Sequence, residues 1–372
     1  MKSKFLQLVL ILLFFSFNTF AQVANTGMVE QMDSADIGKI VLSGYVDVYY
    51  GYDFNEPPNS DRPYAVSSAR HNEININLAY LGMNYTNGKV RARFIPGFGT
   101  YMNANYSSEV GTLRNLVEAN AGVCLSTKRD IWLDAGVIGS PYTNESAISK
   151  DHFMYTRSFA PEYVPYYLTG VKLSGKLSPK ITGYLYVLNG WQNITDNNNQ
   201  LSLGTQIEYR PNNKWLINWN TYVGDETNVN APQFGMRYFS DVYAIYNPDG
   251  RFSFTTCGYT GAQQIKGANN TDSYAYWWQA NFIAKVKLSK STSLAGRVEY
   301  FNDEKNVQIT PITGVGSFST GSAGLCFNMK ISKNALFRIE QKHFFSENTV
   351  YLKRSKATNS DNLLIGNLTV WF

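Results

Sequence analysis

The side chains that most often perform catalysis or bind metals are few in this sequence and far apart. Its 372 residues include 3 His and 3 Cys. None of them lies in a Ser/His, His/Glu or Cys/Cys motif of catalytic or metal-binding spacing. We therefore expect no catalytic residue, no metal site, no cofactor and no disulfide framework. A Ser-His or Asp-His pair assembled across strands is the alternative. The six residues are His71, His152, His343, Cys124, Cys257 and Cys326.

Charged residues occur instead at every second position of several apolar segments. In 89–98, Arg91 and Arg93 alternate with apolar side chains. This period predicts strands with one apolar and one polar face, and charges on the polar face of a pore set its ion preference. The expected pore-wall residues are Arg91, Arg93, Glu208, Arg210, Lys285, Arg297 and Glu299. By the same period, Asp47, Glu118, Asp134, Arg237, Lys287, Arg338 and Glu340 share that face.

The same alternation assigns the faces of residues 73–80. Ile74, Ile76, Leu78 and Tyr80 are expected on the apolar face, and Asn75, Asn77 and Ala79 on the polar face.

The longest connection, residues 142–165, mixes charged and aromatic side chains. A connection of this length is usually functional or disordered, and its aromatic residues favour packing. We expect it to fold inward and narrow the lumen, with Glu145 and Asp151 facing the arginines of the wall. Arg157 is expected to tie the loop to the wall through a carboxylate. An ordinary surface loop is the alternative.

The elements that carry these residues are predicted to be strands. Only 16% of the chain is charged and 15% is aromatic, with a mean hydropathy of -0.27. Beyond the N-terminus no apolar run is long enough for a membrane helix. Together with this composition, that predicts an all-β protein. The sixteen strand candidates are 40–54, 69–86, 89–103, 114–127, 131–141, 166–178, 180–192, 200–210, 214–224, 231–245, 250–261, 273–289, 292–303, 316–331, 334–346 and 359–372.

The connections between these candidates alternate between tight and long. Tight ones such as Asn87-Gly88 contain the Gly, Pro, Asn and Asp residues that short hairpins need. This sorting, over an even number of strands, is typical of a single transmembrane antiparallel β-barrel with short periplasmic turns and long extracellular loops. Closure removes the sheet edges, so the first strand is expected to pair with the last.

The two ends of the chain indicate secretion and membrane assembly. Residues 1–21 have the basic start, apolar run and small cleavage-site residues of a signal peptide. Residues 22–38 read as a periplasmic lead, and 39–372 as the barrel domain. A last strand with Leu368, Val370 and terminal Phe372 resembles the signal read by the barrel-assembly machinery. The alternative for residues 1–21 is a single membrane anchor. The alternative for the last strand is an ordinary amphipathic strand without a signal function. The charges are too few and too scattered for nucleic-acid binding.

Several short motifs resemble the OmpL-like β-barrel porin family. They are Gly139-Ser140-Pro141, Glu145-Ser146, Tyr155-Thr156-Arg157-Ser158, Pro165-Tyr166 and Thr169-Gly170, with Gly44 to Tyr50 at the start and Trp371-Phe372 at the end. The chain has His152-Phe153-Met154 where the family has Asn-Trp before the Tyr-Thr-Arg-Ser run.

The resemblance implies a porin in the outer membrane of a Gram-negative bacterium. We expect a water-filled channel for passive diffusion of small hydrophilic solutes, not an enzyme, with outer-membrane lipids and the assembly machinery as partners. A structural or secretion-associated barrel that binds a protein partner is the alternative. The solute, the pore radius and the oligomeric state are open, with a homo-trimer as one option.

Overall fold

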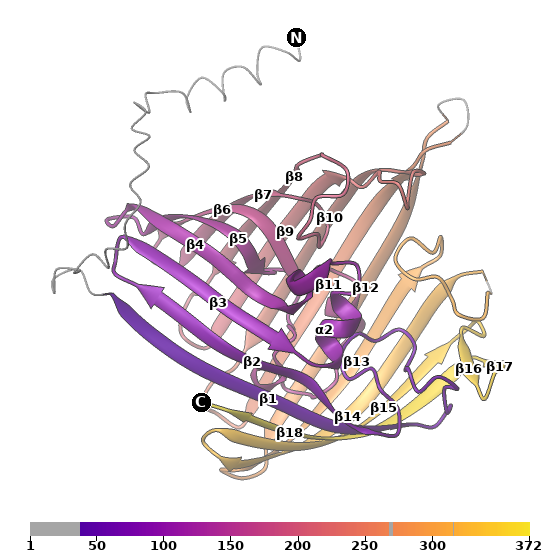
Figure 1. Cartoon of the computed structure of the whole chain (residues 1–372). Helices are drawn as coiled ribbons and strands as arrows, with labels where there is room; N and C mark the ends of the chain where they lie inside the picture. Colours follow the sequence, from indigo (N-terminus) through magenta and orange to yellow (C-terminus); the bar gives the residue numbers. More distant parts are fainter. Residues whose placement is uncertain (1–37, 268–270, 315) are drawn as a thin grey trace. The chain divides into compact units, whose positions relative to one another are not determined.

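The computed structural model describes residues 38–267, 271–314 and 316–372, and these ranges contain a closed antiparallel barrel (Figure 1). The expected signal peptide and residues 22–37 of the expected lead lie outside the described residues. The sixteen barrel strands are β1 (Lys39–Asp53), β2 (Ile74–Thr86), β3 (Val90–Phe98), β4 (Leu116–Ser126), β5 (Ile131–Gly139), β6 (Tyr167–Ser178), β7 (Ile181–Leu188), β8 (Ser202–Tyr209), β9 (Trp215–Asp225), β10 (Phe234–Tyr246), β11 (Phe252–Ile265), β12 (Ser273–Lys287), β13 (Thr292–Asp303), β14 (Phe318–Ser332), β15 (Ala335–Ser346) and β18 (Ser360–Trp371).

Closure occurs between β1 and β18, as the sequence predicted. β1 pairs with β2 on one side and with β18 on the other, where Val46 faces Val370. Beyond the last strand, Gly44 and Phe372 exchange backbone hydrogen bonds of 3.1 and 3.0 Å. The ring of barrel strands therefore has no open edge, and backbone groups at membrane depth are satisfied within the protein.

Most strands have the two faces that their alternation predicted. On β8, Leu203 is 54% exposed on the outside, whereas Gln206, on the opposite face of the same strand, is 6% exposed. On β3, Phe94 and Phe98 point outward and Arg91 points inward. An apolar outer surface around a polar interior is the arrangement that a bilayer requires.

The face prediction is wrong for part of β2. The register shifts at Asp47 and Val48 of β1, whose partners are Leu78 and Ile76, so Asn77 has no partner across the ladder. Such a bulge puts the next side chain on the other face. Ile74 and Ile76 point outward as expected, but Leu78 is fully buried, and Tyr80 stacks on Tyr45 inside the barrel.

Short and long connections are sorted to opposite ends of the barrel. Seven turns of two to five residues join the strand pairs from β2–β3 to β14–β15. Gly88, in the first of these turns, has a φ of 84°, a conformation that a side chain disfavours. This end of the barrel is called the short-turn end below.

The long connections contain short elements that strand periodicity did not predict. They are α2 (Thr100–Asn105), η1 (Gly111–Asn115), η2 (Ser149–Asp151), α3 (Phe159–Glu162) and a separate hairpin of β16 (Tyr351–Lys353) with β17 (Lys356–Thr358). No helix in the described ranges is long and apolar enough to cross a membrane.

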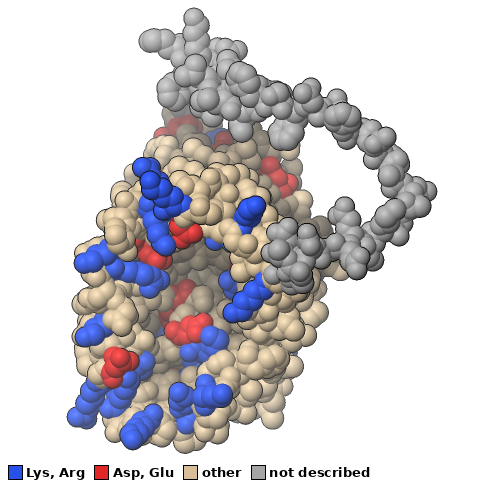
Figure 2. Space-filling model, turned by 90° about the vertical axis from the view of Figure 1, so that its left-hand side faces the viewer, with Lys and Arg blue, Asp and Glu red and all other residues tan. Residues whose placement is uncertain are grey.

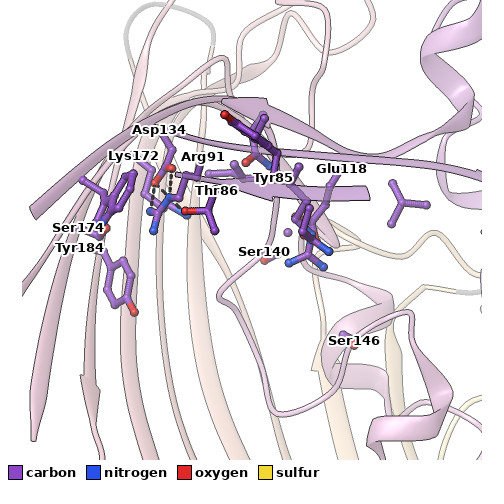
Figure 3. Close-up of a pocket in the computed structure, with 18 of the residues that line it drawn as sticks. Tyr85, Thr86, Arg91, Glu118, Asp134, Ser140, Ser146, Lys172, Ser174 and Tyr184 are labelled. Carbon is purple, nitrogen blue, oxygen red and sulfur yellow. Dashed lines mark hydrogen bonds and ion pairs between the residues drawn. The ribbon is translucent and has the colours of Figure 1, made fainter. Parts of the chain in front are cut away.

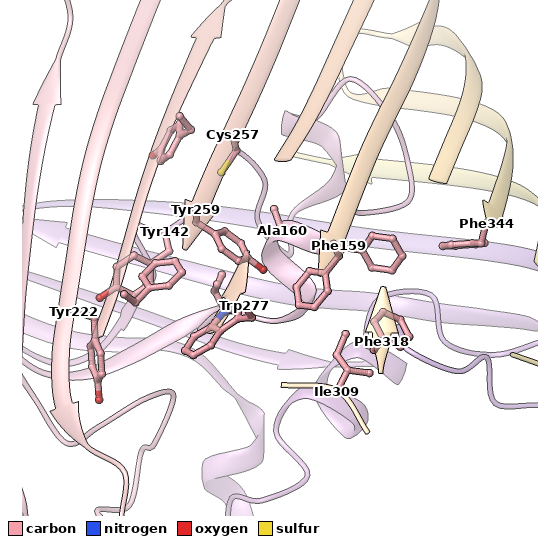
Figure 4. Packing of buried hydrophobic residues seen from close by; sticks show 14 of the residues in the cluster. Tyr142, Phe159, Ala160, Tyr222, Cys257, Tyr259, Trp277, Ile309, Phe318 and Phe344 are labelled. Atoms are coloured by element: carbon pink, nitrogen blue, oxygen red, sulfur yellow. The ribbon is translucent and has the colours of Figure 1, made fainter. Parts of the chain in front are cut away.

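A large part of the hydrophobic core lies inside the barrel. Phe159, from the connection between β5 and β6, packs among Phe301, Phe318 and Phe344 of the wall strands at ring-centroid distances of 5.9–6.2 Å (Figure 4). The long connections are thus part of the packed interior.

Candidate functional site

Residues 142–165, called the inward loop below, cross the interior of the barrel. Met154 and Ala160 are completely buried. Near one end of the loop, the Tyr142 hydroxyl donates to the carbonyl of Thr221 on β9 at 3.3 Å. In the middle of the loop, the Ser149 amide donates to the Tyr45 hydroxyl on β1 at 3.0 Å. The loop therefore contacts strands on widely separated parts of the barrel wall.

Buried carboxylates of the wall hold the backbone of the loop. Glu340 on β15 accepts hydrogen bonds from the amides of Tyr155 and Thr156 at 2.7 and 2.9 Å, and from the Thr156 hydroxyl. Glu299 on β13 accepts from the amide of Phe159. Hydrogen bonds to ionised acceptors are about twice as strong as neutral ones, so these contacts fix the middle of the loop.

Buried basic residues hold the carbonyls of the same segment. Arg297 donates to the Thr156 carbonyl at 2.8 Å and lies 3.2 Å from Glu340. Arg338 donates to the carbonyl and hydroxyl of Ser149, and Lys342 donates to the Arg157 carbonyl at 3.0 Å. Positive and negative side chains thus alternate beneath the loop, and each contacts it.

The loop residues singled out from the sequence have different environments. Glu145 is buried, accepts from the Ser158 amide at 2.8 Å and lies 3.9 Å from Arg297. Asp151 is 55% exposed and pairs with its neighbour Lys150 at 2.6 Å.

The prediction for Arg157 is wrong in one respect. Its guanidinium donates to the carbonyls of Ser146, Ala147 and Tyr155, and no carboxylate in the described ranges lies within 4.0 Å of it. Arg157 therefore stabilises the fold of the loop itself. The desolvated surroundings and the charges of Arg157 and Arg338 hold the pKa of His152 well below its usual range, so this loop residue is neutral at pH 7.

A cavity of about 860 Å³ lies between the inward loop and the wall formed by β1 to β7. Arg91, Glu118, Asp134, Lys172 and Tyr184 line it from the wall, as Figure 3 shows. Its loop side is formed by residues 146–148. The hollow seen from the short-turn end in Figure 2 has charged side chains around and inside it.

Ion pairs organise the charges of this cavity. Arg91 binds Asp134 through two hydrogen bonds of 2.6 Å, and Lys172 lies 3.5 Å from the same carboxylate. Arg93 lies 3.0 Å from Glu118. The expected arrangement, with Arg91 and Arg93 opposite loop carboxylates, is therefore not present, because Arg91 pairs with an acid of β5 and Arg93 with an acid of β4.

Tyrosine side chains form the deep end of the cavity. Tyr101 and Tyr106, from the connection that carries α2, are 1% exposed, and both line the cavity. Tyr101 packs edge-on against Tyr166 at a centroid distance of 5.3 Å, and Tyr106 stacks on Tyr167 at 4.2 Å. Two connections thus meet where the cavity ends.

Comparison with known families identifies the family to which the chain belongs. The sequence model of the family described as "Putative beta-barrel porin-2, OmpL-like" matches residues 39–372. The chain belongs to this porin family. A search of curated proteins finds no match.

Several solved structures share the fold of this porin. The channel DcaP of Acinetobacter baumannii is 11% identical, with a TM-score of 0.61 over 91% of this chain and 99% of that one. Salmonella typhi OmpF in complex with daunomycin is 11% identical, with a TM-score of 0.60 over 92% and 99%. A trimer form of Vibrio cholerae OmpT is 13% identical, with a TM-score of 0.57 over 91% and 100%.

Six of the seven pore-wall residues expected for this porin lie on inward-facing strand positions, and Arg210 lies in the turn that follows β8. Arg91 and Arg93 line the cavity. Glu208 and Arg210 form a 2.7 Å pair near the short-turn end. The remaining three contact the inward loop. Lys285 lies 4.1 Å from the ring centre of Phe153, and Arg297 and Glu299 are buried beneath the loop.

Some residues of the site were missed at the sequence level. Lys172 and Lys342 continue the period-two pattern of β6 and β15, and a stricter application of that pattern would have included them. Tyr101 and Tyr106 had no such signal, because they lie in an irregular connection. In the described ranges, no group of three or more His, Cys, Asp or Glu side chains could hold a metal ion.

Proposed function

We propose that this outer-membrane porin is a non-enzymatic channel for passive diffusion of small hydrophilic solutes, narrowed by the inward loop. One observation carries the proposal: the loop occupies the interior beside β9 to β15 and leaves a cavity lined by ion pairs beside β1 to β7. Solutes would pass along the cavity wall that carries Arg91, Asp134 and Lys172. The paired charges of this wall favour polar solutes over apolar ones.

Single-channel recording on a loop deletion tests the proposal. Replacing residues 145–158 by a short Gly-Ser linker should raise the conductance in planar bilayers. It should also raise the size limit for sugars in liposome swelling, because the cross-section that the loop fills becomes water. Unchanged conductance with a correctly folded barrel would mean that the loop does not narrow the path.

The second candidate is a barrel that binds a protein partner and does not conduct. The packing of Tyr101, Tyr106, Tyr166 and Tyr167 at the deep end of the cavity favours it, because these rings lie across the route. Absence of channel openings from the parent protein and from a Tyr101→Ala/Tyr166→Ala variant would support this candidate. Stable openings of the parent would contradict it.

The oligomeric state of the protein is also a proposal, and it rests on the likeness in fold to a solved structure. We infer a homo-trimer, supported by the trimer form of the Vibrio cholerae OmpT relative in fold. Native mass spectrometry of the protein in mild detergent measures this directly, and a monomer would contradict it. Secretion by a cleaved signal peptide over residues 1–21, and reading of Leu368, Val370 and Phe372 by the assembly machinery, stay predictions.

A further inference from the structure

The short turns are much more basic than the long connections. The residues between strands at the short-turn end include nine basic and two acidic side chains, and each of the seven turns has at least one basic residue. The long connections contain ten basic and twelve acidic side chains. The nine residues, called the basic ring below, are Lys89, Lys128, Arg129, Lys180, Arg210, Lys214, Arg251, Lys290 and Lys333.

These charges have few partners within the protein. All nine side chains are exposed. Arg210 pairs with Glu208, but the other eight have no carboxylate within 4.0 Å among the residues that the structure describes. Figure 2, which views this end of the barrel, shows Lys and Arg side chains around the hollow. An exposed cation without an internal partner is free to bind an anion outside the protein.

The basic ring borders the apolar outer surface of the barrel. Within three residues of the basic side chain in every turn, a large apolar side chain is exposed on the adjoining strand or, for Leu288, at the start of the turn. These residues are Val90, Leu125, Leu177, Tyr209, Phe252, Leu288 and Ile331, which are 37–70% exposed. A basic group next to the end of an apolar belt lies at the depth of lipid headgroups, and long side chains reach that layer readily.

The distribution of the charges indicates which kind of partner they meet. A protein partner would touch one side of the rim, whereas the basic residues occur in all seven turns around the circumference. A bilayer leaflet surrounds the barrel on all sides and meets every turn. Phosphate groups of anionic lipids attract Lys and Arg at this depth.

We propose that the basic ring binds the phosphate groups of anionic phospholipids in the leaflet on the short-turn side, which is the periplasmic leaflet in a porin. The proposal depends on the placement of the barrel in the outer membrane. It does not depend on conduction, so a silent channel would leave it intact.

Lipid association of the full protein tests the proposal. The protein is reconstituted in phosphatidylcholine vesicles with trace spin-labelled phosphatidylglycerol or phosphatidylcholine. The fraction of motionally restricted label is then compared for K89Q/K180Q/K290Q/K333Q and for a matched control, K266Q/K305Q/K353Q/K356Q. The control removes four exposed lysines from the long connections.

We expect the parent and the control to prefer phosphatidylglycerol. The turn variant should lose that preference by up to about fivefold, the factor for one basic residue at an anionic surface. The proposal is overturned if the parent has no preference or if the turn variant keeps it. Equal loss in both variants would also overturn it, because the effect would then be one of total charge. Heat-modifiable migration on gels confirms that each variant is folded.

Discussion

Single charged residues of the barrel interior fall into two groups with different neighbours. Arg91, Asp134 and Lys172 line the cavity. Arg297 and Glu340 meet the backbone of the inward loop and are almost completely buried. The same kind of side chain thus lines the cavity in one half of the lumen and attaches the loop in the other. Substitutions in the two groups should have different effects.

Glu340→Gln should loosen the inward loop. The change removes the charge that accepts three hydrogen bonds from Tyr155 and Thr156 and faces Arg297. Removing one partner of a buried charge pair costs about 3–5 kcal/mol. We expect larger current fluctuations and a higher mean conductance. Glu208→Gln is the matched control, because Glu208 faces the lumen away from the loop, and its current should fluctuate no more than that of the parent. Identical traces for the two variants would argue against Glu340 as an anchor.

Arg91→Gln should shift the reversal potential in a KCl gradient towards that of a cation-selective pore. Asp134 would then have Lys172 as its remaining partner, at 3.5 Å. Asp134→Asn should shift the potential in the opposite direction, and the double variant should return close to the parent value. Shifts of the same sign for both single variants would show that these charges do not act on permeating ions.

At the level of elements, period-two alternation predicted every barrel strand and the pairing of first with last. It could not predict the bulge at Asn77, because a bulge depends on how two strands fit together. It also gave the face of Arg297 without revealing that the loop covers this face. Which side chain meets water and which meets the loop is decided by tertiary packing, for which a strand pattern has no signal.

The closing element leads to a prediction for assembly. Leu368, Val370 and Phe372 are 41–73% exposed on the outside, and the Phe372 ring lies over Gly44 of β1, where an added Cβ would clash with the ring. Phe372→Asp should therefore reduce the yield of heat-modifiable barrel in the outer membrane, while secretion continues. Phe372→Tyr keeps the aromatic ring and should assemble normally. Equal yields of the two variants would show that the aromatic ring of Phe372 does not contribute to closure of the barrel.

At the level of the whole molecule, the outer surface must match hydrocarbon and the inner surface must match water. Leu185 and Tyr184 are neighbours on β7, at the same depth and on opposite faces, with Leu185 57% exposed and Tyr184 lining the cavity. Leu185→Arg should impair insertion, since Arg on the lipid face costs about 2–4 kcal/mol near the bilayer midplane. Tyr184→Arg should insert normally. Quantitative blotting of outer-membrane fractions measures the amount of each variant that is inserted. Equal amounts would contradict the assignment of the outward and inward faces of β7.

The pairing of β1 with β18 has a consequence for the kinetics of folding. Fourteen of the sixteen strand pairings join barrel strands consecutive in the chain, and a fifteenth, between β15 and β18, spans only the connection with the small hairpin. These pairings join strands that are close in the sequence, so they can form one hairpin after another. The seam joins residues more than three hundred positions apart, such as Val46 and Val370, so its closure is the step with the largest loop-closure entropy of any single pairing. Until that step the chain is an open sheet with two unsatisfied edges, and this intermediate is the species most exposed to aggregation.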